Sequence, residues 1–230
     1  MLLFIELNHY MINILAIDTT TSAFSVALRY NGEIFHHFEI APRQHTLLAL
    51  PTIDRLLQQA GITLKDLTVI AVTKGPGGFS GVRTGISLVQ GLALGAELPV
   101  IGISTLALLA QKALRLQKAT HIITALDARQ HELYWAAFIN GAASIPEQVI
   151  SPEQAPFPSE KSENWTIIGS GWDAYSDILK NNASVSLFPI SGEEPDALDL
   201  ISLAEKAYQE QLATSPLDLH PVYLRDKVTF

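Results

Sequence analysis

The chain has 230 residues and a net charge of −8, with 48% hydrophobic and 17% charged residues. This balance predicts a packed core and excludes intrinsic disorder, while the acidic excess argues against tight binding of a nucleic-acid backbone by this chain alone. The lack of cysteine excludes disulfides, thiolate zinc sites and cysteine nucleophiles, and it favours a cytoplasmic location.

Residues 1–10 are set apart from the rest of the sequence. They contain a short apolar run without basic residues, interrupted by Glu6, and no cleavage site follows, so they do not form a signal peptide. Because Met11 directly precedes the first strand pattern, we interpret residues 1–10 as an N-terminal extension outside the fold. The longest apolar candidate for a membrane span, residues 86–98, is too short and too rich in glycine.

The first half, residues 11–105, alternates strand and helix patterns, as a parallel or mixed sheet requires. Apolar and β-branched runs indicate strands, with a hairpin closed at Asn31-Gly32. Apolar residues at helical spacing indicate an amphipathic helix that ends at Gly61. The expected elements are strands at 12–17, 24–30, 33–40, 67–73 and 99–103, and helices at 45–60 and 82–98.

The second half, residues 106–230, repeats the start of the first. At an offset of 109 residues Asp18 falls on Asp127, and Asn31-Gly32 falls on Asn140-Gly141. In both copies an apolar strand ends at an aspartate and a second strand closes at Asn-Gly, which indicates an internal duplication. The other expected features are a strand at 122–126, an irregular loop near 144–163, a strand at 165–168, helices at 172–180 and 197–212, and a tail at 221–225 that returns as a strand or folds over a neighbour.

Two interpretations fit the aspartates at the strand ends. A carboxylate followed by the hydroxyls of Thr19 and Thr20 could hold a cation or phosphate, and Asp18 and Asp127 would then face each other across a nucleotide cleft. Alternatively, each aspartate caps its own turn by accepting backbone N–H groups. Gly169 and Gly171 form a second candidate loop, for close approach of backbone to a nucleotide or for packing alone.

A glycine-rich segment at 74–85 joins a strand to a helix and is the most specific motif. It can present amides to an anion or make a tight connection, and it is not a Walker loop. The following helix carries glycines four residues apart, at 81 and 85 and at 91 and 95. Each glycine costs about 1 kcal/mol relative to alanine in a helix, so close crossing by another helix, of this chain or a partner, is expected to compensate.

The histidines and serines give no catalytic pattern. None of the seven histidines has metal-ligand spacing with a carboxylate on one helix face, and no nucleophile elbow is present. We therefore expect no metal site and no cofactor.

Residues 14–21, the segment 74–85, the turn at 126–129 and the closing residues 221–225 together resemble the TsaB (YeaZ) family, a subunit family of bacterial tRNA threonylcarbamoyladenosine biosynthesis. The resemblance covers residues 11–230. It implies an α/β, duplicated actin/sugar-kinase/Hsp70-like (ASKHA) fold with two related halves. It also implies a role in modifying adenosine 37 of tRNAs that read ANN codons.

The resemblance further implies that this chain is not the catalyst. The catalytic relative, TsaD, holds a metal through a His-x-x-x-His pair after the last strand of its first half, and the matching positions here are Thr105 and Leu109. The glycine of the usual Asp-x-Gly phosphate turn is replaced by Thr20. The alternative is an enzyme for nucleotide hydrolysis or phosphoryl transfer that uses the cleft between the halves.

The resemblance implies partners as well. A TsaD-like subunit would dock on helices of the first half, a TsaE-like ATPase would join the complex, and tRNA would bind only through that complex. In isolation a homodimer is expected. The residues assigned to the partner-binding helices are Leu47, Leu50, Ile53, Leu57, Gly81, Arg83, Gly85, Val89 and Leu92.

Overall fold

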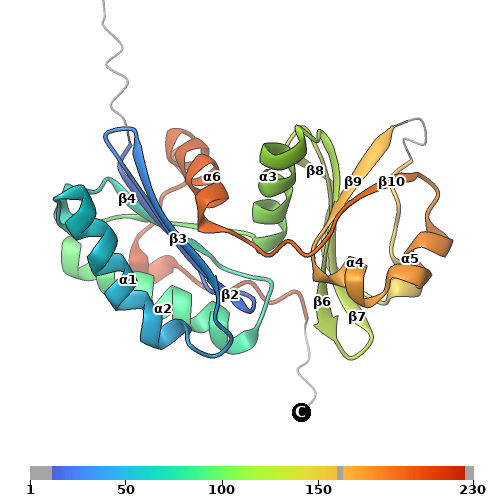
Figure 1. Ribbon diagram of the computed structural model, residues 1–230, viewed down its shortest axis with the longest axis horizontal. Helices are drawn as coiled ribbons and strands as arrows, with labels where there is room; N and C mark the ends of the chain where they lie inside the picture. Colours follow the sequence, from blue (N-terminus) through green and yellow to red (C-terminus); the bar gives the residue numbers. More distant parts are fainter. Residues whose placement is uncertain (1–11, 160–162, 226–230) are drawn as a thin grey trace, which may run out of the picture.

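The computed structural model describes residues 12–159 and 163–225, so the proposed extension at residues 1–10 lies outside the described residues. Ten strands form two five-stranded sheets in this part of the chain (Figure 1). The first sheet contains β1 (Ile14–Asp18), β2 (Ala23–Tyr30), β3 (Glu33–Ile40), β4 (Val69–Thr73) and β5 (Val100–Ile103). The second contains β6 (His121–Arg129), β7 (Glu132–Ile139), β8 (Ala142–Ile150), β9 (Asn164–Ile168) and β10 (Ser186–Ile190).

The two sheets share one topology. The strand order is β3-β2-β1-β4-β5 in the first, and the second, read as β8-β7-β6-β9-β10, matches it strand for strand. The first three strands of each sheet pair antiparallel. The fourth strand, β4 or β9, pairs in parallel with the central strand, and the fifth, β5 or β10, pairs in parallel with the fourth. The internal duplication and the ASKHA-like fold predicted from the sequence are therefore confirmed.

Helices cover both faces of each sheet and create five layers (Figure 1). α1 (His45–Ala60) and α2 (Phe79–Ala96) pack on the outer face of the first sheet, and the short helices α4 (Ser170–Ala174) and α5 (Ser176–Asn182) pack on the outer face of the second. Between the sheets lie α3 (Thr105–Gln117) and α6 (Ala197–Gln209).

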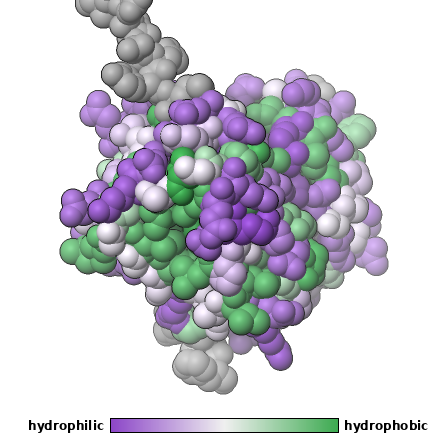
Figure 2. Space-filling view, turned by 60° about the vertical axis from the view of Figure 1, so that its left-hand side comes forward, coloured by the Kyte–Doolittle hydropathy of each residue, from purple (hydrophilic) through white to green (hydrophobic). Residues whose placement is uncertain are grey.

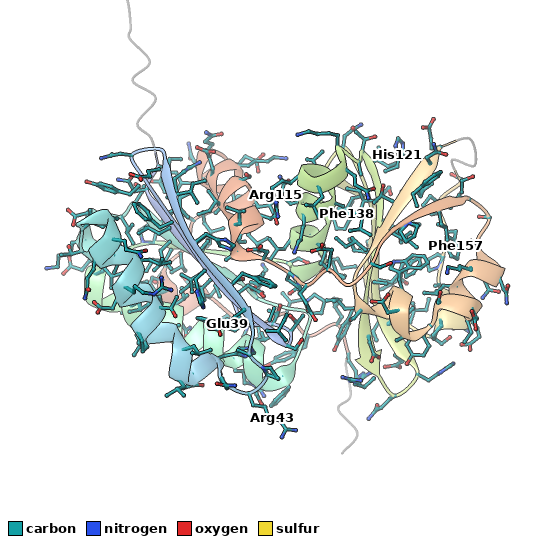
Figure 3. The ribbon with its side chains drawn as sticks, viewed as in Figure 1. Glu39, Arg43, Arg115, His121, Phe138 and Phe157 are labelled. Carbon is teal, nitrogen blue, oxygen red and sulfur yellow. The ribbon has the colours of Figure 1, made fainter. Side chains whose placement is uncertain are left out.

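The two central helices cross over between the halves. α3 follows the first sheet in sequence, yet Leu106 and Leu109 pack on the second sheet. α6 follows the second sheet, yet Leu200 and Ala204 pack on the first. Arg115 of α3 lies between the two helices (Figure 3), and its Nε atom is 2.5 Å from Oδ1 of Asp199 on α6.

Several sequence-based expectations require correction. Residues 144–150, predicted to be loop, lie in β8, an edge strand whose register shifts against β7 and whose side chains are mostly exposed or half-buried, so it lacks the alternation of a one-sided strand. α3 and β10 were not predicted. The helix expected at 172–180 is broken at Tyr175, whose φ of −128° is not helical. Residues 221–225 do not form a strand. They lie against the first half of the same chain, where the Val222 N–H donates to the Lys74 carbonyl (2.8 Å).

The start of α2 sits directly on the turn between β1 and β2. The Gly78 N–H donates to the Thr20 carbonyl (2.7 Å), and Thr19 Oγ1 donates to the Gly81 carbonyl (2.8 Å). A Cβ atom added to Gly85 would lie 2.5 Å from Thr19 Oγ1, whereas one added to Gly91 would meet no atom within 4 Å. Gly85 therefore serves close packing within this chain, and Gly91 does not.

We expect Gly85→Ala to lower the free energy of unfolding by about 1–3 kcal/mol, because overpacking at Thr19 outweighs the gain in helix propensity. The control Gly91→Ala should raise it by about 1 kcal/mol, since that position is exposed and helical. Urea denaturation measures both values. If both substitutions changed the free energy of unfolding in the same direction, close packing against Thr19 would not be the reason for glycine at position 85.

Candidate functional site

A cleft of about 750 Å³ lies where the two halves meet. Its first wall is the turn after β1 and the glycine-rich loop before α2, and its second wall is the β6–β7 hairpin with the start of α4. The C-terminal residues 222–225 complete the lining. The predicted site residues Thr20 and Asp127 line this cleft, whereas Asp18, Thr19, Gly169 and Gly171 do not.

Asp18 is completely buried at the end of β1. Its Oδ1 atom accepts hydrogen bonds from Thr20 Oγ1 (2.8 Å) and from Thr73 Oγ1, while Oδ2 has no hydrogen-bond partner. Burial raises the pKa of this carboxyl from 3.8 to about 6, although both threonine hydroxyls act in the opposite direction. The side chain therefore fixes the turn from inside and is not presented to the cleft.

Asp127 occupies the equivalent position in the second half and is more accessible. Its Oδ1 atom accepts the Arg129 backbone N–H (2.8 Å), and its Oδ2 atom forms an ion pair with Arg129 Nη1 (3.0 Å). The Asp127 N–H donates to Ser170 Oγ (3.2 Å). Asp127 thus accepts a backbone N–H of its own turn, as the capping interpretation expects, whereas the hydrogen bonds to Asp18 Oδ1 come from two threonine hydroxyls.

The two glycines near α4 pack against β6. Gly169 has a φ of +108°, and an added Cβ would lie 3.1 Å from Leu109 of α3. A Cβ on Gly171 would lie 2.6 Å from Leu133. Both glycines thus permit close packing inside the second half, which is the packing alternative stated above.

The residues assigned to the partner-binding helices divide into two groups. Ile53, Leu57, Gly85 and Val89 are buried within the same half, so in this structure they support the helices from inside and are not accessible to a partner. A bulky residue at Gly85 would disturb this chain's own packing first. Gly81 and Leu92 are half-buried, and the exposed members are Leu47, Leu50 and Arg83.

The exposed faces of α1 and α2 carry large apolar side chains. Leu47 is 73% exposed and Leu50 is 55% exposed on α1, while Phe79 and Leu94 are 54% and 50% exposed on α2. Figure 2 turns this side of the molecule forward and shows apolar surface there, crossed by hydrophilic groups. Phe79 and Leu94 are not among the residues assigned from the sequence, because Phe79 falls in the expected glycine-rich loop and Leu94 has no spacing signal that sets it apart from the other leucines of the helix. We call Leu47, Leu50, Phe79, Arg83 and Leu94 the outer helix face.

Within the described residues, no group of three or more His, Asp or Glu side chains is placed to hold a metal ion. The positions matched to the TsaD histidine pair, Thr105 and Leu109, are fully buried in the first turns of α3. None of the helices in the described part of the chain is long and apolar enough to cross a membrane.

The raised pKa of Asp18 predicts a pH-dependent stability difference from Asp18→Asn, which keeps the Oδ1 acceptor but cannot ionise. The protonated carboxyl favours the folded state fully below the unfolded pKa of 3.8, and this contribution is lost as the pH rises through about 6. From about pH 4 to about pH 7 the wild type should lose on the order of 3 kcal/mol relative to the variant. Denaturant titrations of both proteins measure this change, and parallel pH profiles would contradict it.

Comparison with known proteins places this architecture in a family. The family model described as TsaD, tRNA N6-adenosine threonylcarbamoyltransferase, matches residues 37–229. The tRNA threonylcarbamoyladenosine biosynthesis protein TsaB of Haemophilus influenzae is 40% identical over 231 residues, which cover 95% of this chain and 96% of that protein. The TsaB protein of Escherichia coli is 41% identical over 225 residues, which cover 94% and 96%.

A solved structure agrees with these sequence matches. YeaZ from Pseudomonas aeruginosa superposes with a TM-score of 0.86 at 38% identity, covering 93% of this chain and 100% of that chain. Sequence identity, coverage and the duplicated five-stranded architecture show that the chain belongs to the TsaB (YeaZ) family.

Proposed function

We propose that this chain is a non-catalytic subunit that pairs with a TsaD-like catalytic subunit for N6-threonylcarbamoylation of adenosine 37 in tRNAs reading ANN codons. The observation that carries this proposal is the outer helix face, whose four large apolar side chains are each at least half exposed. Apolar surface gathered on neighbouring elements marks an interaction site more often than scattered exposed residues do.

The choice of partner follows from the family. Curated relatives are named for tRNA threonylcarbamoyladenosine biosynthesis, and the family model that matches most of the chain is that of the threonylcarbamoyltransferase itself. Two proteins that share one fold can present similar helix pairs to each other. Without the TsaD-like subunit, the same face would pair with a second copy of this chain, which makes a homodimer the expected isolated form.

Three features support a non-catalytic role. A threonine and a leucine stand at the positions matched to the metal-binding histidines, and Leu109 packs against the Gly169 turn. Asp18 is sealed from the cleft, and Asp127 is engaged by Arg129. The net charge of −8 opposes direct tRNA binding, so tRNA would be held by the complex. The complex would act in the cytoplasm together with a TsaE-like ATPase.

The cleft favours one alternative function, nucleotide hydrolysis or phosphoryl transfer. Its volume of about 750 Å³ lies in the range of small-molecule sites. Calorimetric titration of the isolated chain with ATP and magnesium separates the two proposals. Micromolar or tighter binding followed by turnover would favour the enzyme.

The docking proposal predicts that Leu50→Asp will disrupt pairing, because a carboxylate would be desolvated at the centre of an apolar contact. We expect at least about 30-fold weaker association, the effect typical of a central contact residue. Light scattering measures self-association, and co-purification measures pairing with the TsaD-like subunit. A reconstituted tRNA modification assay should lose activity in parallel.

The matched control is Leu116→Asp. Leu116 is 44% exposed against 55% for Leu50, but it lies on α3, between the two sheets and not on the outer helix face. This variant should associate like the wild type. Undiminished pairing by Leu50→Asp, or equal loss in the control, would show that the docking surface lies elsewhere.

A further inference from the structure

The C-terminal residues 219–225 contact both halves of the molecule, and we call them the C-terminal latch. Their first anchor lies on the first half. Leu219 is only 4% exposed and belongs to the core under α1 and α2. Gln90 Nε2 of α2 donates to the Leu219 carbonyl (3.1 Å), and the Val222 N–H donates to the Lys74 carbonyl at the end of β4 (2.8 Å).

The second anchor is Arg225, which reaches the β6–β7 hairpin of the second half. Its Nη2 atom donates to the Ala128 carbonyl (3.1 Å) and the Arg129 carbonyl (3.4 Å), and it forms an ion pair with Glu132. The Arg225 side chain is 19% exposed, so this charge-assisted contact is largely shielded from water. One side chain therefore ties the end of the chain to the wall of the cleft that the second half provides.

Between the anchors, Tyr223 faces the start of α2. The Arg83 guanidinium lies 3.2 Å from the centroid of the Phe79 ring and 5.4 Å from that of Tyr223, which places it within reach of both aromatic faces. Phe79 and Arg83 belong to the outer helix face. The latch thus touches the cleft and the proposed docking face at once.

The position of the latch has a mechanical consequence. The halves are also joined through α3 and α6, where Arg115 pairs with Asp199, and Lys112 of α3 pairs with Glu193 in the segment before α6 (2.7 Å). Figure 1 shows α3 and α6 on one side of the junction and the C-terminal residues on the other. Two packed bodies joined along one side can rock about it, and a second attachment on the opposite side removes that freedom.

We propose that the C-terminal latch holds the cleft at a fixed opening, with Arg225 as the contact that closes it. Loss of the Arg225 contact lets the two halves rock about α3 and α6, and it releases Tyr223 from Phe79 at the edge of the outer helix face. This proposal does not depend on the identity of the docking partner, because it concerns distances within one chain.

Spin labels on the two halves test the latch in the full chain. The chain has no cysteine, so Arg43→Cys and Lys180→Cys add the only labelling sites. Both positions are exposed, Arg43 on the first half (Figure 3) and Lys180 in α5 of the second. Labelled protein is diluted with unlabelled protein so that pulsed spin-resonance distances report on single chains. Adding Arg225→Ala should broaden the distance distribution and move its mean to a longer value.

The control is Lys206→Ala, which also removes one positive charge but whose side chain is 67% exposed on α6 and pairs only weakly with Glu210 (4.0 Å). It should leave the distribution unchanged, while Glu132→Gln should shift it in the same direction as Arg225→Ala and by less. Hydrogen exchange in the β6–β7 hairpin should accelerate about 10-fold or more in Arg225→Ala, as expected for loss of a charged hydrogen bond. An unchanged distance distribution in Arg225→Ala would overturn the proposal, as would an equal change in Lys206→Ala.

Discussion

The architecture depends on the exchange of the two central helices. Each sheet needs apolar cover on both faces, and the inner cover of each is supplied by a helix that follows the other sheet in sequence. Leu106 and Leu109 follow the first sheet in sequence and cover the inner face of the second sheet, and Leu200, which follows the second sheet, covers Ile14 and Ala16 of the first. The first half, residues 11–105, therefore cannot cover the inner face of its own sheet without α6. The duplicated sequence therefore specifies one interlocked body rather than two separable domains.

The cleft lies between the two sheets that α3 and α6 hold together. Its walls include the turns at the ends of β1 and β6. In the first half, the turn after β1 is used as the seat of α2, since Thr19 and Thr20 bond to the glycine-rich segment. The hydroxyls of Thr19 and Thr20 and the N–H of Gly78, which could otherwise meet a phosphate, thereby have partners within the chain. A close strand-to-helix connection and an open phosphate loop would use the same hydroxyl and amide groups. In this chain these groups bond within the strand-to-helix connection.

The sequence predicted the fold well where local pattern and tertiary role agree. The duplication is predicted by three matching signals at an offset of 109 residues: the apolar runs of β1 and β6, the aspartates that end them, and the Asn-Gly turns. Matching hairpin signals in the two halves lead to the same strand order. α3 has its own helix signal, with Ser104 as N-cap and apolar residues at helical spacing, Leu106, Leu109 and Ala113. β8 and β10 carry weak signals, since both are edge strands with little burial.

The site was less predictable than the fold. Whether a side chain belongs to the site depends on whether it points inward or outward, and residue type does not show this. Helical spacing groups Leu50, Ile53 and Leu57 on one apolar stripe, but the width of that stripe exceeds what the sheet can cover. Ile53 and Leu57 point inward while Leu47 and Leu50 remain in solvent.

The same limit applies to glycine. The sequence alone does not distinguish Gly85 from Gly91. Only the position of Thr19 shows that Gly85 is required for close packing and that Gly91 has space for a side chain. The sequence pattern of one helix does not show which residues from distant parts of the chain pack against it. In this structure Asp18, Thr19 and Gly169 make their contacts within the chain. The apolar groups without internal neighbours lie on the outside, where a second protein can cover them.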